Sequence, residues 1–381
     1  MLGSGDYAVV FGDWHAERMF WQSPEGALID VDWARELNEM SKASVTIAAP
    51  DAVINGLEPW AHTMGIYRNG ELVWFGIVIS TTAKAGIVEV EAADGAKFFK
   101  HRRVPLHRLW QQHDATQIMR THVEDSCGFA DACSMVENMV TYESRIWVNA
   151  AYTPAECMVD EVIDDLVEQG LVWTINAGTL IIGPLPGQYT TAQLSDKDLS
   201  GEFTVIKDGS DVVTDCHVKG KGVWGQFRED SPLGLVQSIE KADGAVREEE
   251  CQQQAERRVK ESAVTPRRLV IPGDSQLLPT APVQVDELVP GVKVPVASTV
   301  TGVNVASVMA IKSVKVRVGD KGEQIKVTLT ETKVTNEVTS MPDPAKIDMR
   351  SPWEKELASK NFSGAGSGEK QETEEVGRPP A

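Results

Sequence analysis

The sequence predicts a β-rich α+β fold in which two β domains are separated by a small α+β insert. Apolar and polar residues alternate, as in strands with one solvent-exposed face, in the first 100 residues and again after residue 200. Amphipathic helical patterns lie between these regions. We therefore expect the first β domain at 1–104, the insert at 105–194, the second β domain at 195–341, and a flexible tail of linker-like composition at 342–381.

The first β domain is predicted from strand patterns and one turn. Ser44–Ala49 is a short strand that ends before a Pro-Asp pair. His62–Arg68 and Glu71–Ser80 flank Asn69-Gly70, a dipeptide that accepts positive φ at both central positions of a tight hairpin turn. Gly86–Ala92 alternates apolar and polar residues, which indicates another strand with one wet face.

The insert is predicted to hold two helices and then a hairpin. Asp114 can cap the first helix, in which apolar residues recur at helical spacing. The second helix begins at the capping box Thr153-Pro-Ala-Glu156 and ends at Gly170. The hairpin covers Leu171–Gly183. The apolar stripe of the second helix consists of Val159, Val162, Ile163, Leu166 and Val167.

The second β domain begins with a predicted hairpin, in which Glu202–Lys207 and Val212–Lys219 flank a turn at Asp208–Ser210. Leu233–Ser262 is expected to form one long, mostly polar helix whose apolar stripe ends at Val246. Such a helix usually lies on a surface or contacts a partner. Three strands are expected to close the domain, at Val292–Val300, Met309–Val318 and Gln324–Thr332.

The charge and composition of the chain disfavour several classes of protein. The 381 residues include 37 Lys and Arg against 56 Asp and Glu, and the net charge of −19 disfavours a basic nucleic-acid binder. The five cysteines are odd in number and scattered, which indicates reduced thiols and synthesis in a cytoplasm. The N-terminus lacks the pattern of a secretion signal, and no apolar run approaches the ~20 residues of a membrane helix. We expect no membrane insertion.

Two motifs that could indicate an active site lack the context that their chemistry needs. Gly273-Asp274-Ser275 resembles an element of one serine-hydrolase family, but the last histidine, His217, lies upstream of the serine, and that chemistry needs a downstream base. Gly220–Gly225 matches the Gly-x-Gly-x-x-Gly pattern of a dinucleotide site, yet no helix start follows it. We interpret the first motif as a loop turn and the second as a β turn.

Three clusters have a structural interpretation beside a functional one. Histidines and cysteines gather in 101–133 without metal-ligand spacing, so we favour a core role for His122, while a metal site in this segment stays open. The carboxylates of 160–168 favour a solvated helix face over the alternatives of a Ca²⁺ site or a surface that binds a cationic partner. The basic, aromatic stretch Lys97–Arg103 fits a strand end with snorkelling side chains better than a single-strand binding site. The metal-type residues are His101, His107, His113, His122, Cys127 and Cys133.

No catalytic set emerges from the residues. We predict no catalytic, cofactor-binding or metal-binding residues and no cofactor, and we expect that the chain is not an enzyme. On its residue chemistry alone, it is an acidic, β-rich protein that is synthesised in a cytoplasm.

Several segments resemble minor tail proteins from long-tailed phages of actinobacteria. Trp60–Ser80 holds an Arg-Asn-Gly hairpin followed by Leu-Val-Trp-x-Gly, which recurs near the N-terminus of those proteins. Pro154–Gly183 is similar to their inserted domain, and Lys207–Gly222 resembles the start of their second β domain. Pro290–Pro295 and Gly322–Leu329 resemble the closing strands of the second β domain in those proteins. The resemblance spans residues 30–335 and rests on the order of elements and on short turn signatures.

The resemblance implies a tail hub of the baseplate-hub type. Such hubs are trimers with two tail-tube-like β-barrel or sandwich domains per chain, so that three chains offer six barrels to a sixfold tail tube. The implied partners are two further copies, the tail tube or distal tail protein, the tape-measure protein and other tip or fibre proteins. DNA would pass at ejection without specific binding, because acidic walls repel phosphates. The implied location is the virion tail tip, after synthesis in the host cytoplasm.

Two alternative functions stay open. The first is a tail-tip adhesin that binds host cell-wall carbohydrate, because ten Trp residues suit sugar stacking. Core packing explains several of these side chains equally well, namely Trp14, Trp21, Trp60 and Trp74. The second is a tail-associated cell-wall hydrolase, for which His113 or His122 would have to be part of a polar site that the sequence does not reveal.

Overall fold

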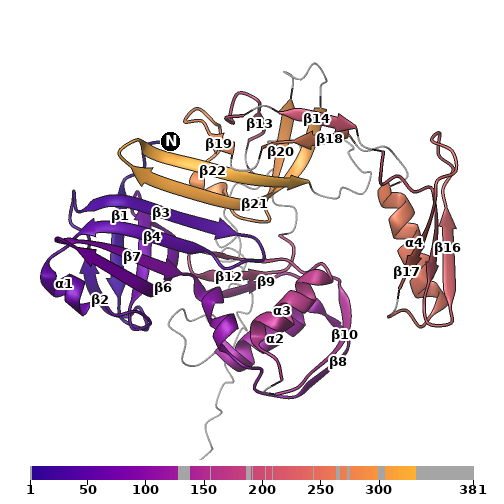
Figure 1. The fold of residues 1–381 in the computed structure, drawn as a ribbon, viewed down its shortest axis with the longest axis horizontal. Coiled ribbons are helices and arrows are strands. Elements are labelled where there is room, and N and C mark those ends of the chain that lie inside the picture. The colour runs from indigo at the N-terminus through magenta and orange to yellow at the C-terminus, as the bar shows by residue number, and fades with distance from the viewer. Residues whose placement is uncertain are drawn as a thin grey trace, which may run out of the picture.

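The computed structural model has two parts, a large main body and a small module that projects from it (Figure 1). The structure describes residues 2–127, 138–154, 156–185, 190, 192–201, 203–207, 209–242, 244–262, 267–272, 275–298 and 305–331. The module is the described part of residues 209–262, and the other described residues form the main body.

The main body is built on a twelve-stranded sheet, with β13-β20-β21-β3-β4-β7-β6-β5-β1-β2 in this order and β22 paired with β21 and β19. The first seven strands are β1 (Tyr7–Gly12), β2 (Met19–Gln22), β3 (Leu28–Glu36), β4 (Lys42–Ala48), β5 (Thr63–Arg68), β6 (Glu71–Lys84) and β7 (Ile87–Ala93). The others are β13 (Leu194–Ser195), β19 (Ser275–Leu277), β20 (Lys293–Ser298), β21 (Val305–Gly319) and β22 (Gly322–Glu331). The predicted β-rich α+β class is confirmed.

The strand predictions of the first β region are confirmed. β5 and β6 form the expected hairpin, in which Asn69 has φ 52° and Gly70 has φ 86°. The strands predicted at Ser44–Ala49 and Gly86–Ala92 correspond to β4 and β7. The three predicted closing strands correspond to β20, β21 and β22.

The sheet runs without a break from one predicted β region into the other. β21 pairs antiparallel with β3, in a register that joins Val316 to Trp33 and Val318 to Val31. Val316 and Trp33 are both fully buried, and they belong to one hydrophobic core with residues from the two regions. Strands distant in sequence therefore bury their apolar faces together.

A second core lies where helices pack beside the sheet (Figure 1). Its helical elements are η1 (Gly95–His101), α2 (Ala115–Cys127) and α3 (Val159–Glu168). Its strands are β8 (Arg108–Asp114) and β10 (Trp147–Tyr152), which pair with each other, and β9 (Met139–Thr141), β11 (Trp173–Asn176) and β12 (Thr179–Ile182). The stripe predicted for the second helix is buried at Val159, Val162, Ile163 and Leu166. A short helix, α1 (Asp51–Gly56), lies apart, beside β2.

The second predicted helix begins later than expected. α3 starts at Val159 and not at the predicted capping box at Thr153. Met158 makes an antiparallel bridge with Arg103, so its backbone is extended and cannot continue a helix. The amide of Met158 instead donates to Glu161 Oε2 at 2.8 Å. The predicted end of the helix is confirmed by Gly170, which has φ 106°.

The module consists of a three-stranded sheet covered on one face by a helix. Its elements are β15 (Asp215–Lys219), β16 (Trp224–Arg228), β17 (Gln237–Lys241) and α4 (Glu248–Ser262). The chain enters through β14 (Thr204–Lys207) and leaves through β18 (Arg267–Val270), and these two strands pair with each other. The module core comprises Val213, Cys216, Val218, Ala245, Cys251, Ala255 and Val259.

Two predictions for this region are wrong. The segments 202–207 and 212–219 do not form a hairpin, because β14 pairs with β18 while β15 pairs with β16 and β17. The long helix predicted at Leu233–Ser262 begins only at Glu248. Gly234, with φ 82°, forms a turn before β17, and the parallel pairing with β15 supplies the hydrogen bonds that a helix would otherwise provide. The predicted β turn at Gly220–Gly225 is confirmed by the hydrogen bond from Gly220 N to Val223 O.

Some sequence predictions fall beyond the described residues. The expected flexible tail at 342–381 lies outside them, as do Gly273 and Asp274 of the Gly-Asp-Ser motif. None of the helices in the described ranges is long and apolar enough to cross a membrane.

Candidate functional site

The candidate site is the joint at which the N-terminal strands meet β21 and β22. It is the place where the two predicted β regions share hydrogen bonds, buried charges and a surface cleft. The joint therefore fixes the position of one β region relative to the other.

A buried carboxylate, Glu323 of β22, collects donors from three segments. Arg68 Nε donates to Glu323 Oε1 at 2.7 Å, and Arg68 Nη2 donates to Oε2 at 3.1 Å. The Tyr7 hydroxyl donates to Oε1 at 2.6 Å, and the Gly3 amide donates to Oε2 at 2.7 Å. The side chains of Arg68 and Glu323 are only 8% and 1% exposed. Two strands and the N-terminal segment are thus tied to the start of β22.

The charge state of this cluster follows from its hydrogen bonds. Burial favours protonation of Glu323, but the hydrogen bonds from Arg68 and Tyr7 outweigh it and lower the pKa of Glu323. Burial and the neighbouring carboxylate raise the pKa of Tyr7, so its hydroxyl keeps its proton and donates. A Cβ on Gly5 would lie 2.7 Å from Arg68 Nε and 2.8 Å from Glu323 Oε1, so only glycine fits there. The cluster is a rigid structural ion pair.

Arg35 of β3 is a second buried cation at the joint. Its Nη1 donates to the carbonyl oxygens of Val285 at 3.2 Å and Leu288 at 3.1 Å. Its Nη2 donates to the carbonyl oxygen of Val73 at 3.0 Å. The guanidinium also lies 4.9 Å from the centroid of the Trp33 ring. Burial lowers the pKa of Arg35 to about 10, so the side chain stays charged at neutral pH and links β3, β6 and the 285–288 turn.

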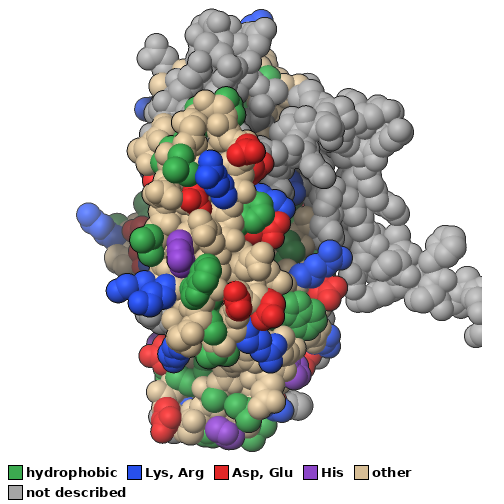
Figure 2. Space-filling model, turned by 90° about the vertical axis from the view of Figure 1, so that its right-hand side faces the viewer, with side chains coloured by type: hydrophobic (Ala, Val, Ile, Leu, Met, Phe, Trp, Pro, Cys, Tyr) green, Lys and Arg blue, Asp and Glu red, His purple; other side chains and the backbone are tan. Residues whose placement is uncertain are grey.

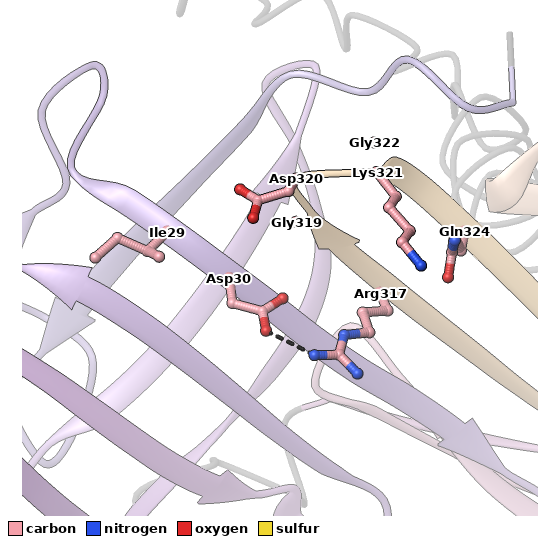
Figure 3. Close-up of a pocket in the computed structure, with 8 residues that line it drawn as sticks. All are labelled: Ile29, Asp30, Arg317, Gly319, Asp320, Lys321, Gly322 and Gln324. Carbon is pink, nitrogen blue, oxygen red and sulfur yellow. Dashed lines mark hydrogen bonds and ion pairs between the residues drawn. The ribbon is translucent and has the colours of Figure 1, made fainter.

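A surface cleft of about 360 Å³ opens beside the joint, between the β21–β22 turn and the start of β3. Asp30 and Arg317 face each other in an ion pair of 3.0 Å (Figure 3). Asp320, Lys321 and Gln324 line it further, so acidic and basic side chains balance. Its described lining includes no Ser, Cys or His, and hence no hydroxyl, thiol or imidazole that could act as a nucleophile or base. The cleft is therefore polar, with two acidic and two basic side chains in its lining.

The histidines and cysteines of 101–133 do not form a metal-type cluster in the part of this segment that the structure describes. His122 is fully buried, as favoured from the sequence, and Trp110 Nε1 donates to its Nε2 at 3.3 Å. Burial lowers the pKa of His122 to about 4, so the ring is neutral. Cys133 lies outside the described residues, whereas the exposed histidines of the segment are His101, His107 and His113.

The two charged segments singled out in the sequence have different outcomes. Four carboxylates of α3 are exposed, as expected for a solvated face, namely Glu161, Asp164, Asp165 and Glu168. Asp160 differs, because it is half-buried and its Oδ1 has no hydrogen-bond partner among the described residues. The prediction of a strand end at Lys97–Arg103 is wrong, because η1 occupies Gly95–His101. Asp94 accepts a hydrogen bond from Ala96 N at 3.0 Å and so caps this turn. The two aromatic residues, Phe98 and Phe99, are core residues at 1% and 2% exposure.

The residues of the joint were not found from the sequence. One signal was present: Arg35 follows Val31 and Trp33 at the spacing of the buried face of a strand, which marks an inward-pointing charge. Glu323 and Arg68 are more than 250 residues apart, and nothing in their local sequence indicates that they meet. Their pairing depends on the register of a sheet that only the structure shows.

No protein-family model and no curated protein matches the chain. Solved structures do match it across most of its length. The 43 kDa tail protein of prophage MuSo2 from Shewanella oneidensis has a TM-score of 0.58 and 12% identity, covering 86% of this chain and 99% of that one. A tail protein from Neisseria meningitidis MC58 has a TM-score of 0.58 and 13% identity, covering 86% and 98%.

The fold is that of phage tail proteins. The prophage tail protein gp18 from Listeria monocytogenes EGD-e also matches, with a TM-score of 0.50 and 13% identity over 92% of this chain and 98% of that one. At such low identity the likeness establishes the fold. The resemblance to tail proteins is therefore confirmed at the level of the fold, and the specifically actinobacterial origin stays a prediction.

Proposed function

We propose that the chain is a structural protein of a phage tail, a trimeric hub at the distal end of the tail tube. The observation that carries the proposal is the match of the whole fold to phage tail proteins, with 98–99% of each of those chains covered. The joint supports it, because a load-carrying component needs its β regions held in a fixed orientation. Glu323 and Arg35 hold them through buried contacts.

The trimer is part of this proposal, because a threefold hub could then fit a sixfold tube. Each chain supplies two β regions, so three chains present six, which matches the symmetry of a tube with six subunits per ring. In this proposal the hub closes the tube, anchors the tape-measure protein and carries tip or fibre proteins. The chain's net charge of −19 weakens any contact with DNA phosphates, so that DNA passes at ejection without specific binding.

The experiment is a mass measurement of the full chain followed by its localisation in the particle. Native mass spectrometry should give three times the 41.6 kDa of one chain. Antibody labelling in electron micrographs of the phage should place the protein at the tail tip. A chain that stays monomeric at tens of micromolar, or label along the tube shaft or on the capsid, would overturn the hub.

We also propose that the chain is not an enzyme. The buried His122 is neutral, and its Nε2 accepts a hydrogen bond from the Trp110 indole, so this nitrogen is not free to act as a base. The purified chain should leave cell-wall material intact in a zymogram. Clearing that is lost in a His113→Ala or His122→Ala variant that still folds would show a hydrolase instead.

A further inference from the structure

One face of the module's sheet is covered by none of the residues that the structure describes. α4 packs on the face that holds Cys216 and Val218, and its backbone comes so close that a Cβ on Gly225 would lie 2.3 Å from Gln252 N. The other face of the sheet lies opposite the helix. We call it the open face, and by strand register it consists of Asp215, His217, Lys219, Trp224, Gln226, Arg228, Gln237, Ile239 and Lys241.

The open face is preorganised by a buried carboxylate. Asp215, which is 4% exposed, accepts hydrogen bonds from Gln226 Nε2 at 2.9 Å and from Gln237 Nε2 at 2.7 Å. The His217 ring lies 5.1 Å from the Trp224 ring. Side chains from all three strands are therefore already ordered, which reduces the entropy that a partner would have to offset on binding.

The exposed part of the open face is apolar in places and basic around them. Trp224 is 54% exposed and Ile239 is 80% exposed. Lys219, Lys241 and Arg228 surround them, and Lys219 and Lys241 have no ion pair among the described residues. Figure 2 shows apolar and histidine side chains among Lys, Arg, Asp and Glu on the face turned to the viewer. A bare isoleucine favours a protein partner over a sugar or a phosphate, and the basic residues favour an acidic one.

An acidic surface with exposed apolar side chains lies at the opposite side of the same molecule. β2 is the outermost strand of the large sheet, and its Met19 and Phe20 are 66% and 40% exposed. α1 packs beside them, because a Cβ on Gly56 would lie 3.0 Å from Phe20 Cζ. We call β2, α1 and their flanks the acidic edge, since their exposed carboxylates are Glu17, Glu25, Asp51 and Glu58. Arg18 is the only Lys or Arg among these residues.

The two surfaces lie at opposite ends of the molecule, the acidic edge on the left and the module on the right of Figure 1. One chain therefore presents two different surfaces that are complementary in charge and that both expose apolar side chains. Contacts of this kind are head-to-tail, and repeated head-to-tail contacts close into a ring when the rotation permits. A contact of the open face with another open face would instead place like charges against each other.

We propose that the open face of the module docks on the acidic edge of a second copy of this chain. The proposal rests on the trimeric hub proposed above and names the surfaces that join its subunits. Lys219 and Lys241 contact the carboxylates of Asp51 and Glu58, while Trp224 and Ile239 cover Met19 and Phe20.

The test is a charge reversal on each side, measured by native mass spectrometry and sedimentation on the full chain. K219E/K241E should raise the dissociation constant at least tenfold, and D51K/E58K should do the same. The variant with all four changes should regain a wild-type constant, because every contact then pairs Glu with Lys again. K197E/K312E changes the net charge equally at exposed sites elsewhere and should behave as wild type.

The outcomes distinguish a failure of the proposed contact from a failure of the proposed trimer. A wild-type trimer that neither reversal weakens would overturn the proposed contact and leave the hub intact. A wild-type chain that stays monomeric would overturn the hub and the contact together. W224A, with an unchanged circular dichroism spectrum, should weaken the trimer as well. If the reversals leave the trimer intact but K219E/K241E loses binding to heparin, the open face binds a polyanion and the proposal is wrong.

Discussion

The main sheet and the module bury their apolar residues on different scales. The core of the main sheet includes large side chains such as Trp33 and Phe11, and it draws on both β regions. The module core has seven buried residues, most of them small, such as Cys216 and Ala255. The connection between the two parts consists of β14 and β18, which pair over four residues. The main body is therefore expected to unfold as one unit, and the module as a weaker, separate one.

The main body and the module also differ in the role to which each is suited. The main body is tied by contacts between residues that are hundreds of positions apart, such as Arg68 with Glu323 and Asp30 with Arg317. In the module, no described residue covers one face of the sheet, although side chains from its three strands are ordered by Asp215. A rigid body with a small appended module is suited to holding a shape while offering a surface to a neighbour.

The largest expected effect comes from breaking the buried pair of the main body. Glu323→Gln leaves Arg68 buried without its counter-charge and weakens the hydrogen bonds from Tyr7 and Gly3. We expect a loss of about 3–5 kcal/mol in the free energy of unfolding. Urea denaturation followed by tryptophan fluorescence measures it. A loss below about 1 kcal/mol would show that the joint does not hold the two β regions together.

The second effect should stay within the module. Gly225→Ala places a Cβ 2.3 Å from Gln252 N and so pushes α4 off β16, at an expected cost of about 1–3 kcal/mol. Hydrogen exchange should speed up in β15, β16 and α4 and stay unchanged in β3 and β21. Gly244→Ala is the matched control, because nothing lies within 4 Å of its Cβ position. Faster exchange throughout the main sheet would show that the two parts unfold together.

The sequence predicted elements whose signals are local. The β5–β6 hairpin followed from Asn69-Gly70, whose positive φ values need those residue types. The end of α3 followed from Gly170, and the core position of His122 from the apolar stripe of its helix. In each of these cases the determining contacts lie within a few residues of one another, so the amino-acid pattern carries the information.

The failures of prediction share a different cause. β14 finds its partner in β18, about sixty residues later, so the adjacent segments 202–207 and 212–219 only looked like a hairpin. β17 became a strand because β15 was available to pair with it in parallel. The joint at Glu323 depends on the same kind of distant register. Sheet pairing between remote strands is set by the whole core, and local propensity does not report it.

A third effect should appear as opposite pH dependences within the main body. Burial lowers the pKa of His122 to about 4, so the unfolded chain binds a proton that the folded chain does not, and stability falls as the pH drops from 6.5 towards 4. Burial raises the pKa of Asp94 from 3.8 to about 6, so the folded chain binds the extra proton, and stability rises over the same descent. The two contributions oppose each other in the wild type.

Single variants should separate them. Asp94→Asn removes the contribution that stabilises the protein at low pH, so only the destabilising contribution of His122 remains. The free energy of unfolding should then fall between pH 6.5 and 4.5 by roughly 1–2 kcal/mol more than in the wild type. His122→Gln should have the opposite effect, so that the free energy of unfolding falls less than in the wild type over this pH range. Hydrogen bonds from Gln226 and Gln237 lower the pKa of Asp215 in the module, so its stabilisation is lost only below its ordinary value. Asp215→Asn should leave the slope unchanged in this window. Equal slopes in all three variants would contradict the assignment.

The smallest effect is expected for an ion pair of the same sheet that faces solvent. Arg317 and Asp30 lie 3.0 Å apart in the surface cleft, with side chains that are 65% and 35% exposed. Water and salt screen this pair, so Arg317→Gln should lower the free energy of unfolding in urea far less than Glu323→Gln does, and less still at 1 M salt. Glu323→Gln and Arg317→Gln each remove one charge from the joint and differ in burial. A loss from Arg317→Gln as large as that from Glu323→Gln would mean that the number of ion pairs, and not their burial, holds the two β regions together.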